Sequence, residues 1–106
     1  MTESEFNELT HVTFNRIEAG LERAEGDIDF ELAAGNVLEI ECPNGKIIVN
    51  RQPAMREIWV AARSGGFHYR WQESAWINTR DKSELLQSLS GMIADQGGGI
   101  VRFDQA

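Results

Sequence analysis

A series of short turns between residues 33 and 66 constrains the fold of this chain more than any other feature. Pro43-Asn44-Gly45 and Ser64-Gly65-Gly66 are strong hairpin signals, and residues 33–36 and 51–53 also interrupt strand-like segments. Turns this short join neighbouring strands that run antiparallel. The sequence therefore predicts an antiparallel sheet whose strands cover residues 27–32, 37–42, 46–50, 57–62, 67–71 and 75–78.

The hydrophobic period changes near residue 26. Residues 4–24 carry apolar side chains at spacings of three and four, which predicts a helix with Ser4 as its N-cap and Gly26 as its stop. In residues 27–32, apolar and acidic side chains alternate strictly, which predicts a strand with one buried face. The apolar positions of the two segments are Phe6, Leu9, Thr13, Ile17, Leu21 and Ala24, then Ile28, Phe30 and Leu32.

A second helix is predicted near the end of the chain. Asp81 and Glu84 form a D-x-x-E capping box, and apolar side chains follow at helical spacing up to Ile93. The glycines at 97–99 end the helix, and residues 100–103 are expected to pack on the domain as an extended tail. The predicted fold is a single α+β domain over residues 1–106, a two-layer sandwich with two helices on one face of a roughly six-stranded antiparallel sheet.

Charge is concentrated at one end of the chain. The formal net charge is −7, and residues 1–31 hold nine acidic and two basic residues, so the remaining residues are neutral overall. Such an acidic end repels phosphates and disfavours nucleic acid as a partner, whereas it favours metal cations or a basic protein surface. No apolar run approaches the roughly 20 residues of a membrane helix. The single cysteine, Cys42, is read as a core residue of a protein from a reducing cytoplasm.

The acidic side chains at the end of the first helix continue into the first strand. Glu18 and Glu22 are one helical turn apart and share a face, with Glu25, Asp27 and Asp29 following. Their ligand atoms are oxygens, which suit Ca²⁺, Mg²⁺, Mn²⁺ or Fe²⁺. No motif for an enclosed metal site is present, so weak and exchangeable binding is expected. The alternative is a solvated charged surface that only aids solubility.

Catalysis has little support in the sequence. Carboxylates on an exposed helix and edge strand have no cleft walls to raise the pKa of one member of a pair. There is no G-x-S-x-G motif, and the glycine pairs fit hairpin turns rather than a phosphate loop. We therefore expect a protein that is not an enzyme.

Trp59 is a candidate for protein binding. Alternation places Ile58 and Val60 in the core, so that Trp59 projects from the opposite face of the sheet. A tryptophan on an open face is typical of an interaction hot spot when an arginine flanks it, and the candidates here are Arg51, Arg56, Arg63 and Arg70. The alternative is an indole that lies flat on its neighbours.

These segments together resemble the frataxin family, in particular its bacterial members. The resemblance is carried by S-E-F at 4–6, D-I-D-F-E at 27–31, N-R-Q at 50–52, I-W-V-A at 58–61 and G-G-F-H-Y at 65–69. It implies an α-β sandwich that binds iron weakly along its first helix and first strand, with other divalent cations able to substitute. It also implies binding to the cysteine desulfurase and scaffold of iron–sulfur cluster assembly in the bacterial cytoplasm, as a regulator or iron chaperone. The implied protein is a monomer that assembles further only with excess iron. The residues so implied are Glu18, Glu22, Glu25, Asp27, Asp29 and Glu31 for metal, and Asn50, Gln52 and Trp59 for protein contact.

Two alternatives to a regulator remain open. Some frataxins are credited with iron oxidation or storage as oligomers, and a purely protein-binding acidic module without a metal also fits the composition. The chain departs from its relatives at Ala19 and Arg23, which replace usual acids, and at Pro53, which comes one position early. The first two changes reduce the number of carboxylates that are available to bind a metal.

Overall fold

A computed structural model describes residues 1–34 and 36–103 of the chain. Within these residues, six strands form one antiparallel sheet, and their order in the sheet is their order in the chain. Each strand therefore pairs with the one before it, as the short turns predict. The strands are β1 (Asp29–Ala33), β2 (Val37–Cys42), β3 (Gly45–Gln52), β4 (Glu57–Ala62), β5 (Gly65–Gln72) and β6 (Ala75–Asn78).

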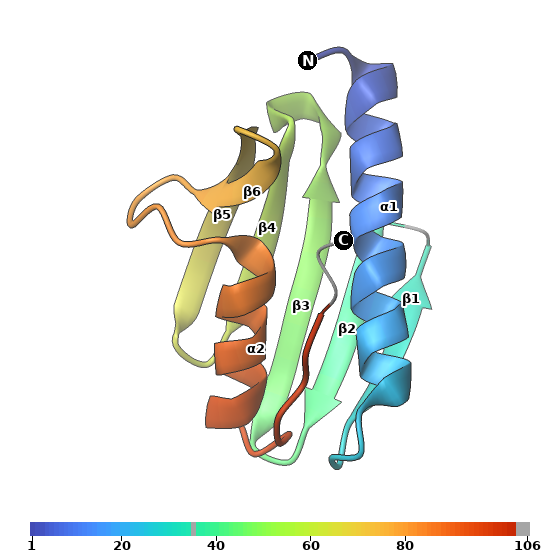
Figure 1. The fold of residues 1–106 in the computed structure, drawn as a ribbon, viewed down its shortest axis with the longest axis vertical. Helices are drawn as coiled ribbons and strands as arrows, with labels where there is room; N and C mark the ends of the chain where they lie inside the picture. Colours follow the sequence, from blue (N-terminus) through green and yellow to red (C-terminus); the bar gives the residue numbers. More distant parts are fainter. Residues whose placement is uncertain (35, 104–106) are drawn as a thin grey trace.

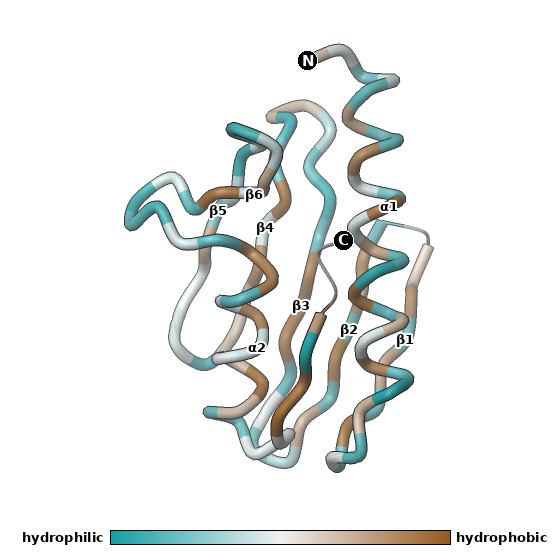
Figure 2. Tube along the Cα trace, viewed as in Figure 1, coloured by the Kyte–Doolittle hydropathy of each residue, from teal (hydrophilic) through white to brown (hydrophobic). Residues whose placement is uncertain are grey.

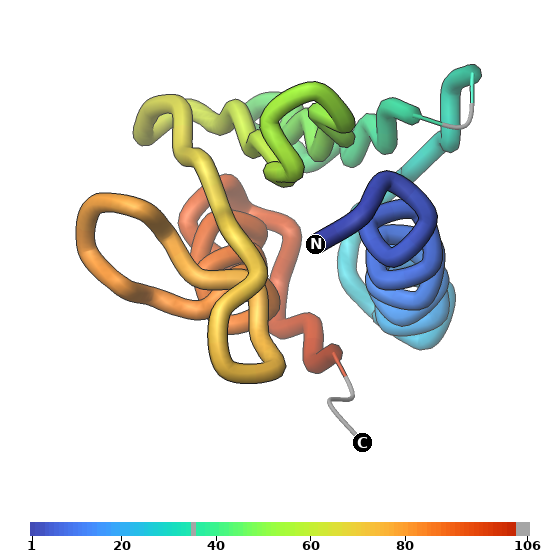
Figure 3. Tube along the Cα trace, turned by 90° about the horizontal axis from the view of Figure 1, so that it is seen from above, coloured from blue at the N-terminus to red at the C-terminus, as the bar shows by residue number. Residues whose placement is uncertain are grey.

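Two helices cover one face of this sheet. Helix α1 (Glu3–Arg23) precedes the sheet in the chain and α2 (Leu85–Asp95) follows it (Figure 1). Seen from above, both helices lie on the same side of the central strands (Figure 3). The predicted two-layer α-β sandwich is confirmed, and the opposite face of the sheet, called here the free face, carries no helix of the described chain.

The core lies between the helices and the sheet. Alternate residues of the central strands, such as Ile47, Val49, Ile58 and Val60, are at most 1% exposed. Hydrophobic and hydrophilic segments alternate along α1, as an amphipathic helix requires (Figure 2). The predicted tail also packs inside, because the segment at 100–103 runs between the two helices in Figure 1 and its Val101 and Phe103 side chains are buried.

The N-cap of the first helix lies two residues earlier than predicted. Thr2, not Ser4, is the N-cap: its hydroxyl accepts from the Glu5 backbone N–H, and the Glu5 carboxylate accepts from the Thr2 N–H. This reciprocal pair satisfies two backbone donors at once, which Ser4 cannot do because no Glu or Gln lies three residues after it. At the other end the helix stops at Arg23, with Ala24 as its C-cap before Gly26 is reached.

The second helix begins later than predicted. Glu84, rather than Asp81, is its N-cap, and its carboxylate accepts from the backbone N–H groups of Leu86 and Gln87. Asp81 instead accepts from the N–H and hydroxyl of Ser83 and closes a turn. Lys82 between them has φ +66°, a left-handed conformation that a right-handed helix cannot contain.

Several strand ends differ from the prediction: β1 begins at Asp29 rather than Asp27, β3 begins at Gly45, and β5 extends from Gly65 to Gln72. Arg51 and Gln52 continue β3 instead of breaking it, and the short 3₁₀ helix η1 (Pro53–Met55) makes the turn that follows. Leu32 is 42% exposed rather than buried, because β1 is an edge strand and has a neighbour only on the β2 side. The predicted turn at 33–36 includes Gly35, which lies outside the described residues.

The end of α2 ties the helix layer to the hairpin turns. Gly97, at φ +83°, donates to Ala94 O, and Gly98 donates to Ile93 O, which together close the helix as predicted for this glycine run. The buried Gln96 side chain accepts from the Arg63 N–H and donates to Gly45 O. These bonds fix the β2–β3 and β4–β5 turns beneath α2. Among the described helices, none has the length and apolar character needed to cross a bilayer.

Candidate functional site

Trp59 lies in the middle of the free face. Its strand neighbours Ile58 and Val60 are buried in the core, whereas Trp59 is half-buried on the other side of the sheet. The register places it between Asn50 of β3 and His68 of β5. This confirms the strand alternation predicted for Trp59.

The indole of Trp59 is stacked on the imidazole of His68. The ring centroids are 4.4 Å apart and the planes differ by 9°. The two residues are directly opposite each other across the β4–β5 hairpin, so their side chains rise from the same face at adjacent positions. The indole is therefore supported on one side by another ring.

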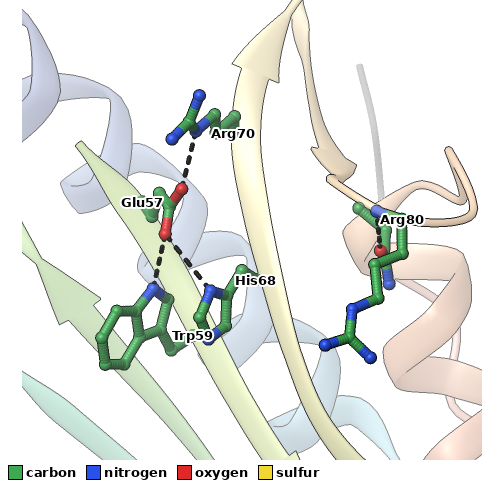
Figure 4. Close-up of polar contacts among 6 residues, drawn as sticks. Glu57, Trp59, His68, Arg70 and Arg80 are labelled. Carbon is green, nitrogen blue, oxygen red and sulfur yellow. Dashed lines mark hydrogen bonds and ion pairs between the residues drawn. The ribbon is translucent and has the colours of Figure 1, made fainter. Parts of the chain in front are cut away.

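Glu57 is a buried carboxylate on this otherwise solvated face. Its side chain is only 3% exposed. One oxygen, Oε1, accepts from Trp59 Nε1 at 2.7 Å and lies 3.5 Å from His68 Nδ1. The other oxygen, Oε2, accepts from Arg70 Nε at 2.6 Å. Figure 4 shows the carboxylate between these three side chains, and we call Glu57, Trp59, His68 and Arg70 the Glu57 cluster.

The charge of Glu57 is stabilised in this position. Burial alone would raise the pKa of the carboxyl group, but hydrogen bonds from Trp59 and Arg70, with the charge of Arg70 and then that of His68, bring its pKa below the usual 4.5. The group is therefore an anion at neutral pH. A buried anion with good partners fixes the side chains that surround it.

The lowered pKa of Glu57 predicts a pH dependence of stability. Because the pKa is lower in the folded state, the stabilisation is complete above the usual value of 4.5 and is lost as the pH falls through the lowered pKa. The free energies of unfolding in urea of the unchanged protein and of Glu57→Gln should therefore differ more at about pH 7 than at about pH 3. An equal difference at both values would show that the charge of Glu57 does not stabilise the fold.

The other residues expected to contact protein share the face of Trp59. Asn50 is its direct neighbour, and Gln52 is opposite Glu57, which in turn is opposite Arg70. Both amides are half-buried. The structure thus brings Asn50, Gln52 and Trp59 together as one surface, and their role in binding stays a prediction.

Sequence reasoning did not single out Glu57 or assign a role to His68. A buried carboxylate cannot be recognised from Glu57 itself, since the residue alternates with core positions in the same way as a solvated one. The sequence feature that could have revealed this site is the Ser64-Gly65 turn. This turn sets the strand register and places Glu57 opposite Arg70 and Trp59 opposite His68. Arg70 is the arginine that joins Trp59 through Glu57, whereas Arg51 faces the helix layer, with its Cζ 4.8 Å from the centre of the Phe14 ring.

The acidic residues divide between the two faces. We call the six predicted metal-binding positions the acidic ridge. Glu18 is half-buried on α1, and the remaining five are exposed. Because Phe30 packs against the core, Asp29 and Glu31 point to the free face, away from α1. The ridge consists of Glu18, Glu22, Glu25, Asp27, Asp29 and Glu31.

Two strand residues that the sequence analysis passed over join the ridge on the free face. Asp29 is directly opposite Glu41, and Glu31 is directly opposite Glu39. These four carboxylates line a hollow beside Phe30. Like charges placed opposite each other repel, and Lys46 relieves part of the repulsion, with its Nζ 3.2 Å from Glu39 and 3.6 Å from Glu41.

No group of three or more His, Cys, Asp or Glu side chains is arranged to hold a metal ion among the residues that the structure describes. The carboxylates occur instead singly or in opposed pairs. Oxygen pairs of this kind provide ligands for a hard cation but leave most of its coordination to water.

The fold and the site together define a class of protein: a two-layer α-β sandwich with an acidic end and a tryptophan fixed on the free face of its sheet. The family model described as a frataxin-like domain matches residues 1–99. The chain belongs to the frataxin-like family, as the sequence motifs indicate.

Individual relatives agree over nearly the whole chain. The iron–sulfur cluster assembly protein CyaY of Dechloromonas aromatica is 52% identical over 102 residues, which are 95% of this chain and 97% of that protein. The protein of the same name from Herminiimonas arsenicoxydans is 53% identical over 103 residues, 92% of each chain. The solved structure of the frataxin from Psychromonas ingrahamii superposes with a TM-score of 0.91 at 33% identity and covers 99% of this chain and 100% of that one.

Proposed function

We propose that this chain acts in iron–sulfur cluster assembly as a regulator or iron chaperone rather than as an enzyme. It binds the iron–sulfur scaffold through Asn50, Gln52 and Trp59, and the cysteine desulfurase through the acidic ridge. Family membership supports the process, since relatives that match nearly the whole chain are named iron–sulfur cluster assembly proteins. The observation that carries the proposal is Trp59, which the Glu57 cluster holds on a face that no helix covers in the described chain.

The free face has the composition of a binding surface. Its centre has a half-buried aromatic ring beside two amide side chains, and aromatic anchors surrounded by polar groups are typical of interaction hot spots. The acidic hollow lies on the same face at β1 and β2. A partner with an apolar contact for Trp59 and basic side chains facing β1 therefore complements this surface.

Cluster formation in vitro tests the proposal. A purified cysteine desulfurase and scaffold would be supplied with cysteine and Fe²⁺ without oxygen, and the initial rate of cluster formation followed by absorbance. Adding this chain should change the rate, and Trp59→Ala should remove most of that change. Glu73→Gln, at the exposed β5–β6 turn, is the control. A rate that is the same with and without the chain would contradict the proposal.

The acidic ridge is proposed to bind iron weakly. Divalent cations should bind near Glu18, Glu22, Asp27 and Asp29 and raise the midpoint of thermal unfolding, because they bind only the folded arrangement and reduce carboxylate repulsion. Monovalent salt should reproduce part of the effect by screening. The measurement is a thermal scan with and without Fe²⁺, in the absence of oxygen, at constant ionic strength.

The matched variants for this prediction differ only in where two acids are removed. Glu22→Gln with Asp29→Asn should lose most of the metal-induced rise, whereas Glu73→Gln with Asp95→Asn, which makes the same charge change outside the ridge, should keep it. Equal rises in both double variants would place the metal elsewhere.

A further inference from the structure

The Glu57 cluster contains a negative charge that is buried, so this charge is not explained by a need for solubility. Glu57 is 3% exposed at its side chain, and burying a carboxylate is unfavourable unless donors replace the lost water. Its donors come from Trp59 and Arg70, and His68 adds a third contact. All three partners are more exposed than the carboxylate that they surround. The carboxylate therefore acts as the centre of the cluster.

The two oxygens of Glu57 hold different parts of the surface. Oε1 fixes the N–H edge of the Trp59 indole, while Oε2 fixes the guanidinium of Arg70. The indole is held a second time by its stacking on His68. Trp59 thus has its N–H satisfied and its ring plane set before any partner arrives (Figure 4).

Such an arrangement affects affinity. A side chain that must be ordered when a partner binds weakens the complex by roughly twofold to tenfold, and a side chain ordered beforehand avoids this loss. Because the indole N–H is already bonded to Glu57, a partner does not have to supply an acceptor for it. The contact that Trp59 offers is therefore the apolar surface of its ring.

We propose that Glu57 is a positioning residue for scaffold binding: its carboxylate holds the Trp59 indole in the orientation that the scaffold recognises. This inference rests on the proposed function, in which Trp59 contacts the scaffold. Glu57 itself lies beneath the surface and contributes through Trp59.

The first test needs no partner. The indole N–H signal of Trp59 is assigned by its loss in Trp59→Phe, and its exchange with solvent is measured by NMR. Exchange should be slow in the unchanged protein and at least tenfold faster in Glu57→Ala. Glu57→Gln keeps an acceptor for the N–H and should restore most of the protection. Equal exchange in all three proteins would overturn the inference.

The second test is a double-mutant cycle with the purified scaffold protein. Glu57→Ala should weaken binding about tenfold when Trp59 is present and by less than about twofold when Trp59 is already alanine, because a residue that acts through another has no effect of its own. Thermal unfolding of each variant checks that it is folded, and Glu57→Met, which has a similar length but offers no oxygen acceptor, replaces Glu57→Ala in the cycle if the alanine variant is not. Glu73→Gln again controls for the lost charge.

The outcomes separate the inference from the function on which it rests. If Trp59→Ala weakens scaffold binding and Glu57→Ala does not, or if the two effects simply multiply, Glu57 is not a positioning residue and the proposed function stands. If Trp59→Ala leaves scaffold binding unchanged, the proposed sheet-face contact is wrong, and the inference is overturned with it.

Discussion

Trp59→Ala is expected to weaken binding to the iron–sulfur scaffold by about 2 kcal/mol or more while leaving the protein folded. The large effect follows from the place of Trp59 at the centre of the free face, where a partner would remove its ring from water. The fold should survive because Trp59 is half-buried outside the core formed by Ile58 and Val60. Isothermal titration with the purified scaffold, together with circular dichroism, measures both effects.

Trp59→Phe provides the matched control for this prediction. Phenylalanine keeps an aromatic ring on His68 but cannot donate to Glu57, so its affinity should lie between those of the unchanged protein and the alanine variant. Affinity that is unchanged in both variants would remove Trp59 from the interface. Unfolding of the alanine variant would mean that the stack with His68 carries more of the fold than its half-exposed position indicates.

Reversing Glu18 and Glu22 to lysine is expected to slow association with the cysteine desulfurase by on the order of tenfold to a hundredfold at low salt. The acidic end of the chain attracts a basic surface at long range, and such steering changes the on-rate more than the off-rate. The effect should shrink as ionic strength rises beyond roughly 0.1 M, where the Debye length is about 10 Å. Stopped-flow or surface-based kinetics at two salt concentrations measures it.

The same experiment includes one variant that should strengthen the complex and control variants that should change association little. Arg23→Asp adds an acid within the helical part of the ridge and should tighten the complex, and Trp59→Ala should leave this contact nearly unchanged. Glu73→Lys with Asp95→Lys makes the same change in net charge away from the ridge and should slow association much less. Rates that depend only on net charge, or not on salt, would reduce the ridge to a solubility feature.

Much of the fold was predictable because local signals agreed with each other. The change of period between Leu21 and Ile28 separated helix from strand, and the turns at Asn44-Gly45 and Ser64-Gly65 set the neighbours in the sheet. The errors fell at element ends, where several polar residues compete for the same role. Thr2 with Glu5 formed the capping box in place of Ser4, and the left-handed Lys82 moved the start of α2 from Asp81 to Glu84.

The candidate site was predictable only where it depends on one strand. The alternation of side chains along β4 was enough to place Trp59 on the free face of the sheet, because its neighbours on either side are apolar. The burial of Glu57 depends on three partners from two strands, and a sequence does not state which pairs of side chains meet. The acidic hollow was missed for the same reason, since Glu39 and Glu41 approach Asp29 and Glu31 through pairing of β1 with β2 rather than along the chain.

We propose that the assembly machinery binds the free face around Trp59 together with the acidic ridge. The most direct measurement is an NMR titration of isotope-labelled protein with the purified desulfurase–scaffold complex. The signals of Asn50, Gln52 and Trp59, and of ridge residues such as Glu22, should shift or broaden first. Changes confined to α2 and the β5–β6 turn, with the Trp59 indole signal unaffected at saturation, would contradict it.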